Sequence, residues 1–296
     1  MIGAIAGIGA AICWAGAGLL VKPLSTRFSS PSLNSIRVLA GWIFLMVILS
    51  PLGKVAEMGS VPVSSVAYLM GSGVVGLAIG STLFIRSLSL TDISRVYPVT
   101  YGLWLLGTVA ISEIFLGEAI TGFTILGAAL IVSGIVLLAR PSRERQAADA
   151  GAGTPQGASG IVLAAGAGIC WAAGSTLLKL GLSETSPPVV NMLRLPAAAL
   201  ILIALVAWRE GPATFSRYDW KSMLQITGAG VLEQGLGAVL YFMSIELSGV
   251  AKATVLANTS PLFVIPFAII ILKERVTRRV ILGTVFCVLG ICLTVL

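Results

Sequence analysis

Three ionisable side chains lie inside long apolar stretches of the sequence. Arg37 and Arg194 each follow a proline by six residues, after Pro31 and Pro188, and Glu233 is the acidic residue nearest the middle of an apolar stretch. If each proline begins a helix, its arginine lies about two turns inside that helix. A guanidinium can clamp a carboxylate or phosphate group, or act as an element of a gate. A carboxylate in the same setting can contact an ammonium group or carry a proton.

Each of these side chains also has a structural alternative. An arginine near a helix end can extend towards the membrane interface or fix the end of its helix. An ionised carboxylate without a partner is strongly disfavoured in an apolar interior. Glu233 is therefore expected to be protonated, hydrated or paired with an arginine or lysine. The sequence leaves both interpretations of Arg37, Arg194 and Glu233 open.

Aromatic side chains form a second group of candidates. Trp14 and Trp171 lie near the middle of apolar stretches, away from the interfaces where tryptophan is usually enriched. Their indole N–H groups need acceptors, so they either line a pocket or pack in the core. Further candidates for the wall of a binding site are Tyr101, Trp104, Tyr241 and Asn258. For these four, core packing or hydrogen bonding between helices is the alternative.

The composition indicates that these residues belong to a membrane protein. The chain has 296 residues, of which 57% are hydrophobic and only 10% charged, and its mean hydropathy is +1.01. A soluble domain carries about 25% charged residues. Apolar stretches of about 20 residues, long enough to cross a bilayer, occupy 3–21, 33–50, 64–85, 93–112, 119–139, 160–178, 188–207, 222–243, 250–272 and 280–296.

A sequence repeat divides these stretches into two sets of five. Residues 9–37 and 166–194 are identical at 12 of 29 positions, with a constant offset of 157. At this offset Gly76 is the counterpart of Glu233, so the two copies differ there. After five crossings the chain is on the opposite side of the membrane from its start. The second copy is therefore expected to be inverted relative to the first.

The predicted fold is an all-α integral membrane protein with ten transmembrane helices in two inverted five-helix repeats. The predicted organisation is a first repeat at 1–140, a linker at 141–158 and a second repeat at 159–296. Inverted repeats are typical of secondary transporters, whose substrate site lies between the two halves near the middle of the membrane.

The distribution of positive charge predicts the orientation. When Arg95 and Lys252, at the very start of their stretches, are counted with the preceding loops, loops after odd-numbered stretches hold fourteen lysines and arginines and loops after even-numbered stretches hold three. Because cytoplasmic loops are enriched in positive charge, the linker is expected to be cytoplasmic and both termini periplasmic or extracellular. The net charge of +7 is thus explained by membrane topology, and no nucleic-acid partner is expected.

The sequence favours a transporter without a cofactor. It has no histidine, its four cysteines lie inside apolar stretches, and it has no zinc-ligand spacing or nucleotide-binding loop. No metal, cofactor or enzymatic activity is therefore predicted. The expected partners are a small-molecule substrate and the lipid bilayer, with the chain a monomer or a homodimer.

Three motifs recur in the same order in both halves. The first is a small-residue helix that carries a tryptophan, at Gly9–Leu20 and Gly166–Leu177. The second is Pro-x-x-Asn-x-x-Arg, and the third is a Glu-x-x-Thr turn before each fifth helix. In these motifs the chain resembles the ten-helix members of the drug/metabolite transporter superfamily, which are built from two EamA-type repeats. The resemblance implies an inner-membrane carrier, commonly an exporter of amino acids or other small metabolites.

One feature departs from the small four-helix multidrug relatives, which couple to protons through a glutamate in the first helix. Here the first helix of each half contains no carboxylate, and Cys13-Trp14 and Cys170-Trp171 occupy the middle of those helices. The function predicted from the sequence is an alternating-access exporter of amino acids or related metabolites. The alternatives are a multidrug or lipid-headgroup efflux carrier and, from other classes, a small membrane sensor or an enzyme acting on lipid-linked substrates.

Overall fold

The computed structural model describes residues 1–116, 121–139, 156–181, 187–248, 253, 256–274 and 276–294. Within these ranges the chain is helical and contains no β-strand. The helices of the first half are α1 (Ile2–Leu24), α2 (Ser30–Leu49), α3 (Lys54–Glu57), η1 (Met58–Ser60), α4 (Val63–Ser72), η2 (Gly73–Gly80), α5 (Ser81–Leu90), α6 (Ile93–Leu116) and α7 (Gly122–Ala139). Those of the second half are α9 (Gln156–Gly181), α10 (Pro187–Arg209), η3 (Pro212–Arg217), α11 (Trp220–Gly230), η4 (Val231–Gly237), α12 (Ala238–Ser248), α14 (Ser260–Ile270) and α15 (Arg278–Thr294).

A helix overlaps each of the ten apolar stretches predicted from the sequence. Among the described residues, six helical stretches are long and apolar enough to cross a membrane: Ile2–Leu24, Ser30–Leu49, Val63–Leu90, Ala158–Gly181, Val189–Arg209 and Trp220–Ser248. Two shorter apolar helices cover Ile125–Leu138 and Ser260–Ile270. The chain is therefore a multi-pass, all-helical membrane protein. Most of the predicted linker lies outside the described residues, and α9 already includes its last three positions.

Local signals explain where several helices begin. Ser29 caps α2, because its hydroxyl accepts a hydrogen bond from the backbone N–H of Ser32 at 3.3 Å, and a proline follows in the first turn. Glu274 lies before α15, where its charge would favour the start of that helix. Its carboxylate instead accepts hydrogen bonds from the backbone N–H groups of Ile93 and Ser94, at 3.0 and 3.3 Å. Glu274 thus caps α6, a helix of the other half.

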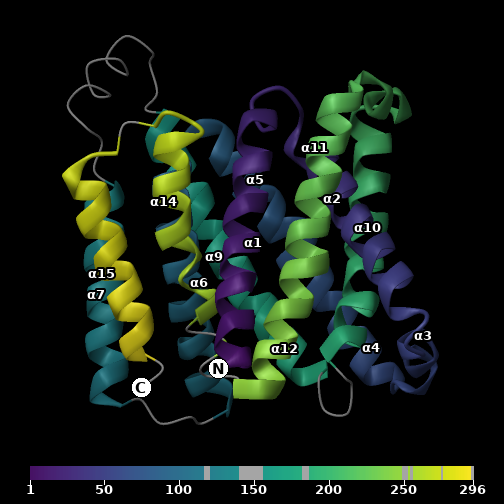
Figure 1. The fold of residues 1–296 in the computed structure, drawn as a ribbon, viewed down its shortest axis with the longest axis horizontal. Coiled ribbons are helices and arrows are strands. Elements are labelled where there is room, and N and C mark those ends of the chain that lie inside the picture. Colours follow the sequence, from purple (N-terminus) through teal and green to yellow (C-terminus); the bar gives the residue numbers. More distant parts are fainter. Residues whose placement is uncertain are drawn as a thin grey trace.

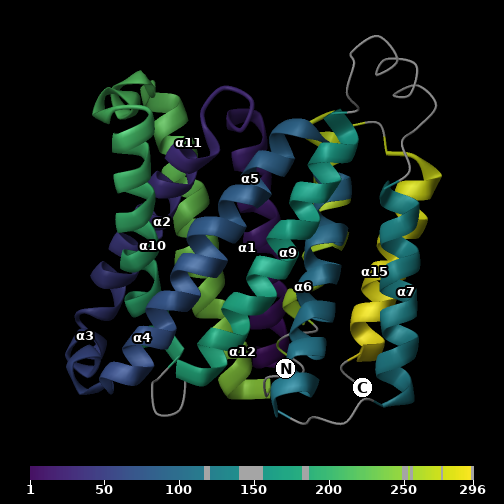
Figure 2. The ribbon, with the colours of Figure 1, turned by 180° about the vertical axis from the view of Figure 1, so that it is seen from behind.

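The helices form a bundle in which corresponding elements of the two halves occupy corresponding places. On one face α1 packs against α11, α12 and α14 (Figure 1). On the opposite face α9 packs against α4, α5 and α6 (Figure 2). α2 and α10 pack together at one edge, and α7 and α15 at the other. The chain begins α1 and finishes α15 at the same end of the bundle (Figure 1).

A short π-helix interrupts the third helical stretch of each half. These are η2, between α4 and α5, and η4, between α11 and α12. A π-helix is rare in proteins and is found most often at functional sites. An offset of 157 places the end of η2 at Gly80 on the end of η4 at Gly237. The feature is therefore present in both copies of the repeat.

Close helix contacts between the halves recur with the same offset. A Cβ atom on Gly73 would lie 2.2 Å from the carbonyl oxygen of Arg194, and one on Gly230 would lie 2.2 Å from that of Arg37. Only glycine permits this approach, because the neighbouring atoms are backbone. Each crossing thus joins the third stretch of one half to the second stretch of the other and places both arginines between the halves.

Candidate functional site

Arg37 and Glu233 form an ion pair between α2 and η4. The Arg37 side chain is 1% exposed and that of Glu233 is 17% exposed, so Arg37 is fully enclosed while Glu233 keeps some access to its surroundings. The pairing alternative that the sequence left open for Glu233 is the one observed. Each charge of this buried pair neutralises the other, and either charge alone would be strongly disfavoured there.

Hydrogen bonds fix Arg37 from its own helix. Its second guanidinium nitrogen donates to Asn34 Oδ1 at 2.8 Å, and Asn34 Nδ2 donates to the Leu77 carbonyl oxygen at 2.8 Å and to Thr82 Oγ1 at 2.9 Å. The network therefore joins α2 to the π-helix of its own half. Asn34 was not selected as a site residue from the sequence. Its position three residues before the arginine in both halves is a signal, because side chains at i and i+3 are neighbours on a helix.

The tryptophan and tyrosine candidates gather in one aromatic cluster between the two halves, formed by Trp14, Tyr101, Trp104, Trp171 and Tyr241. Ring centroids are 5.5 Å apart for Trp14 and Tyr241, and 5.9 Å apart for Trp104 and Trp171. The remaining contacts among cluster members have centroid distances from 5.7 to 6.5 Å. These tilted and edge-to-face arrangements are typical of favourable aromatic pairs.

The aromatic cluster is joined directly to the charged pair. Trp14 Nε1 donates to the carbonyl oxygen of Glu233 at 3.2 Å, and the carbonyl oxygen of Trp14 accepts from the hydroxyl of Tyr97 at 2.6 Å. Tyr97 also stacks on Tyr101 with a centroid distance of 5.3 Å. Tyr97 was not selected from the sequence, because a tyrosine directly before Pro98 carries no signal that separates it from other interior aromatic residues.

Arg194 differs from its repeat mate Arg37. It is partly buried, and one guanidinium nitrogen donates to Asn191 Oδ1 at 3.3 Å. Its Nε, like that of Arg37, has no hydrogen-bond partner. The ion pairs among the described residues do not include Arg194. Its guanidinium lies beside Gly76, where a Cβ atom would be 3.8 Å from the Arg194 nitrogen. Gly76 is the repeat mate of Glu233, so the second arginine faces a glycine where the first faces a carboxylate.

Two further polar side chains contact the charged pair or the aromatic cluster. Gln234 donates from Nε2 to Glu233 Oε1 at 3.2 Å. Ser175 accepts a hydrogen bond from Trp104 Nε1 at 2.8 Å and was not selected from the sequence. Each of them satisfies a polar group that would otherwise be left among apolar side chains.

Asn258 is buried in the turn before α14. Two residues later, the hydroxyl of Ser260 donates to the Ala11 carbonyl oxygen at 3.1 Å. This turn is therefore held against α1, the helix that also carries Trp14. A role for Asn258 in substrate binding stays a prediction.

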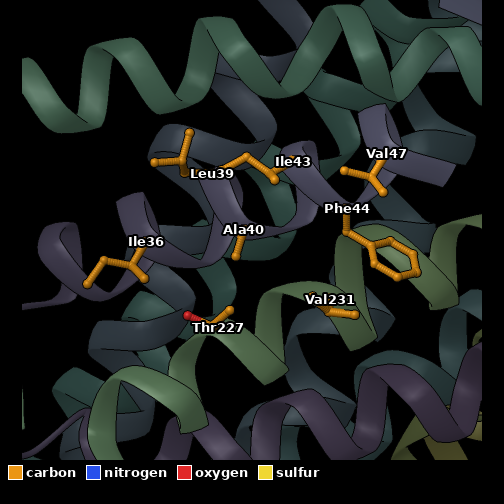
Figure 3. Close-up of a pocket in the computed structure, with 8 residues that line it drawn as sticks. All are labelled: Ile36, Leu39, Ala40, Ile43, Phe44, Val47, Thr227 and Val231. Atoms are coloured by element: carbon orange, nitrogen blue, oxygen red, sulfur yellow. The ribbon is translucent and has the colours of Figure 1, made fainter. Parts of the chain in front are cut away.

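A separate apolar groove lies between α2 and the helical stretch of α11 and η4 (Figure 3). Its volume is about 400 Å³, and Thr227 is the polar residue among those that line it. Two of the lining side chains, Ile43 and Val47, are 50% and 65% exposed. An open apolar surface of this kind suits the acyl chain of a lipid better than a polar solute.

Comparison with known proteins gives the family. The sequence matches the EamA-like transporter family over residues 1–140 and 158–296. An "Uncharacterized transporter" of Archaeoglobus fulgidus is 25% identical over 97% of this chain and 95% of its own length. A protein of Listeria monocytogenes named "Putative sugar uptake protein" is 27% identical over 72% of each chain.

The fold is also similar to that of a solved structure. A crystal structure of a protein with 18% sequence identity superposes with a TM-score of 0.67 and covers 98% of this chain and 95% of its own. At that identity the likeness concerns the fold alone. The family match, by contrast, spans nearly the whole sequence in two segments. The chain belongs to the EamA-like transporter family.

Proposed function

We propose that this protein is a secondary carrier that moves small organic metabolites by alternating access between two inverted five-helix halves. The observation that carries the proposal is the recurrence of contacts between the halves. Gly73 meets Arg194 as Gly230 meets Arg37, and Gly80 meets Trp171 as Gly237 meets Trp14. Reciprocal contacts of this kind are expected when two similar halves pack about a two-fold axis. Carriers built this way bind substrate between their halves.

The proposed binding site is the region where the aromatic cluster meets the two arginines. The cluster offers apolar and aromatic walls, while Arg194 and Glu233 offer charge. Polar groups of this kind fix the orientation of a ligand within a largely apolar site. Asn258 is proposed as a further lining residue that comes into contact in another conformation of the carrier.

The orientation proposed from the positive charges places the ends of α1, α5, α10 and α14 at the cytoplasm. Loops at that end carry most of the lysines and arginines. The membrane is proposed to be the inner, or plasma, membrane, and the direction of transport to be export of amino acids or related metabolites. Sugar uptake is the second candidate, because two Listeria relatives are named for it.

Counterflow into proteoliposomes tests the proposed function. Vesicles loaded with one unlabelled solute are expected to accumulate the same labelled solute transiently, because a carrier exchanges solute without an external energy source. The panel contains amino acids, sugars and cationic drugs, and protein-free vesicles are the control. Uptake of sugars alone favours the second candidate, whereas failure of every solute would contradict a carrier.

A further inference from the structure

We propose that Arg194 is the binding site for an oxyanion group of the substrate, either a carboxylate or a phosphate ester. This inference rests on the proposed carrier function and names the chemical class of its substrate. The ligand group would occupy the place beside Gly76 that corresponds to the Glu233 carboxylate in the other half. A guanidinium is well suited to such groups, since it presents parallel N–H donors in a planar fork.

The contacts of Arg37 and of Arg194 follow the same pattern except at one position, which is Glu233 opposite Arg37 and Gly76 opposite Arg194. Arg37 and Trp14 of the first half both contact the stretch that contains η4 of the second half, and the Glu233 side chain neutralises Arg37. Arg194 and Trp171 of the second half both contact η2 of the first half, with a glycine, Gly76, at the position that matches Glu233. An arginine within the membrane is costly unless a counter-charge is supplied. A substrate oxyanion supplies that charge when it binds.

Hydrogen-bond donors of Arg194 and Trp171 lie along η2. Trp171 Nε1 donates to no acceptor among the described residues, whereas its mate Trp14 donates to a carbonyl oxygen. Arg194 Nε has no partner, which is also true of Arg37 Nε. Trp171 lies beside Gly80, one helical turn from Gly76, with its Nε1 3.1 Å from where a Cβ atom on Gly80 would be. Two donors from α9 and α10 therefore flank consecutive turns of η2.

The space beside Gly76 accepts a Cβ atom. A Cβ atom there would lie 3.6 Å from Gly174 Cα and 3.8 Å from the Arg194 guanidinium, which are ordinary van der Waals distances. Gly76→Glu is designed to bring a carboxylate next to Arg194, as in the Arg37–Glu233 pair. Gly76→Gln adds a side chain of the same shape without the charge and is the matched control.

The experiment measures binding of three probes that share an aromatic ring: phenylacetate, phenyl phosphate and phenylethylamine. Full-length protein in a maltoside detergent avoids phosphate from lipids, and quenching of tryptophan fluorescence reports binding. At least one oxyanion probe is expected to bind about tenfold more tightly than the amine. Phenylacetate as the tighter probe identifies a carboxylate, and phenyl phosphate identifies a phosphate ester.

The variants distinguish the effect of an added negative charge at residue 76 from the effect of an added side chain of the same shape. Gly76→Glu is expected to weaken oxyanion binding about tenfold or more, and Gly76→Gln to weaken it much less. Arg194→Gln should lose the preference for oxyanions, whereas Arg194→Lys should keep part of it. Equal effects of Gly76→Glu and Gly76→Gln, or affinity for the amine equal to that for both oxyanions, would overturn the inference.

Failure of this inference is distinguishable from failure of the carrier function. Counterflow of sugars or amines that Gly76→Glu leaves unchanged would overturn the oxyanion site and support a carrier. Oxyanion binding that depends on Arg194, without counterflow of any solute, would support the site and contradict the carrier.

Discussion

Glu233→Gln is expected to lower the free energy of unfolding by about 3–5 kcal/mol, because it leaves the enclosed guanidinium of Arg37 without its counter-charge. The Arg37 side chain is 1% exposed, so water cannot replace the lost carboxylate. The remaining hydrogen bond to Asn34 does not neutralise the charge. Equilibrium unfolding of the purified protein in mixed micelles measures the difference from the wild type.

The double variant Arg37→Gln and Glu233→Gln is the control for this prediction. It removes both charges and is expected to be more stable than Glu233→Gln alone, since no buried charge remains unpaired. Losses that simply add in the double variant would show that the two side chains do not stabilise each other.

Gly230→Ala and Gly73→Ala are expected to lower the free energy of unfolding by about 1–3 kcal/mol each, because each added methyl group meets a backbone carbonyl. The Cβ atom would lie 2.2 Å from the carbonyl oxygen of Arg37 or Arg194, so the helices must separate. The same unfolding measurement applies, and similar losses for both variants are expected because the two crossings correspond in the repeat.

Gly228→Ala provides a control on the same helix as Gly230. The nearest atom to its Cβ would be Leu20 Cδ1 at 4.0 Å, so the methyl group fits without a clash. Alanine favours a helix over glycine by about 1 kcal/mol, and this variant is expected to be unchanged or slightly more stable. A loss equal to that of Gly230→Ala would contradict the role given to the crossing.

Much of the helical framework follows from the sequence, since apolar stretches of sufficient length must form helices in a bilayer. The repeat also makes Gly76 the counterpart of Glu233 without any knowledge of their contacts. What the sequence did not provide was the partner of Glu233. Arg37 lies 196 residues away, and only the packing of one half against the other brings the two together.

The different surroundings of Arg37 and Arg194 could not be predicted from the sequence either. Both arginines occupy the same motif, and the difference lies in what the opposite helix presents to each. The π-helices also gave no periodic signal, because their residues fit an α-helix as readily by composition. Trp14 and Trp171 were selected from the sequence, but their shared aromatic cluster depends on the tertiary fold.

Distances between spin labels at the two ends of the bundle test alternating access most directly. In a variant without the four native cysteines, one label pair replaces Arg27 and Asp219, whose side chains approach to 3.9 Å at one end. The other pair replaces two exposed residues, Val63 at the start of α4 and Leu180 in the last turn of α9. α4 begins and α9 ends at the opposite end of the bundle. Addition of a solute that shows counterflow is expected to lengthen one distance and shorten the other. Distances that change in the same direction at both ends, or at neither end, would contradict alternating access between the two halves.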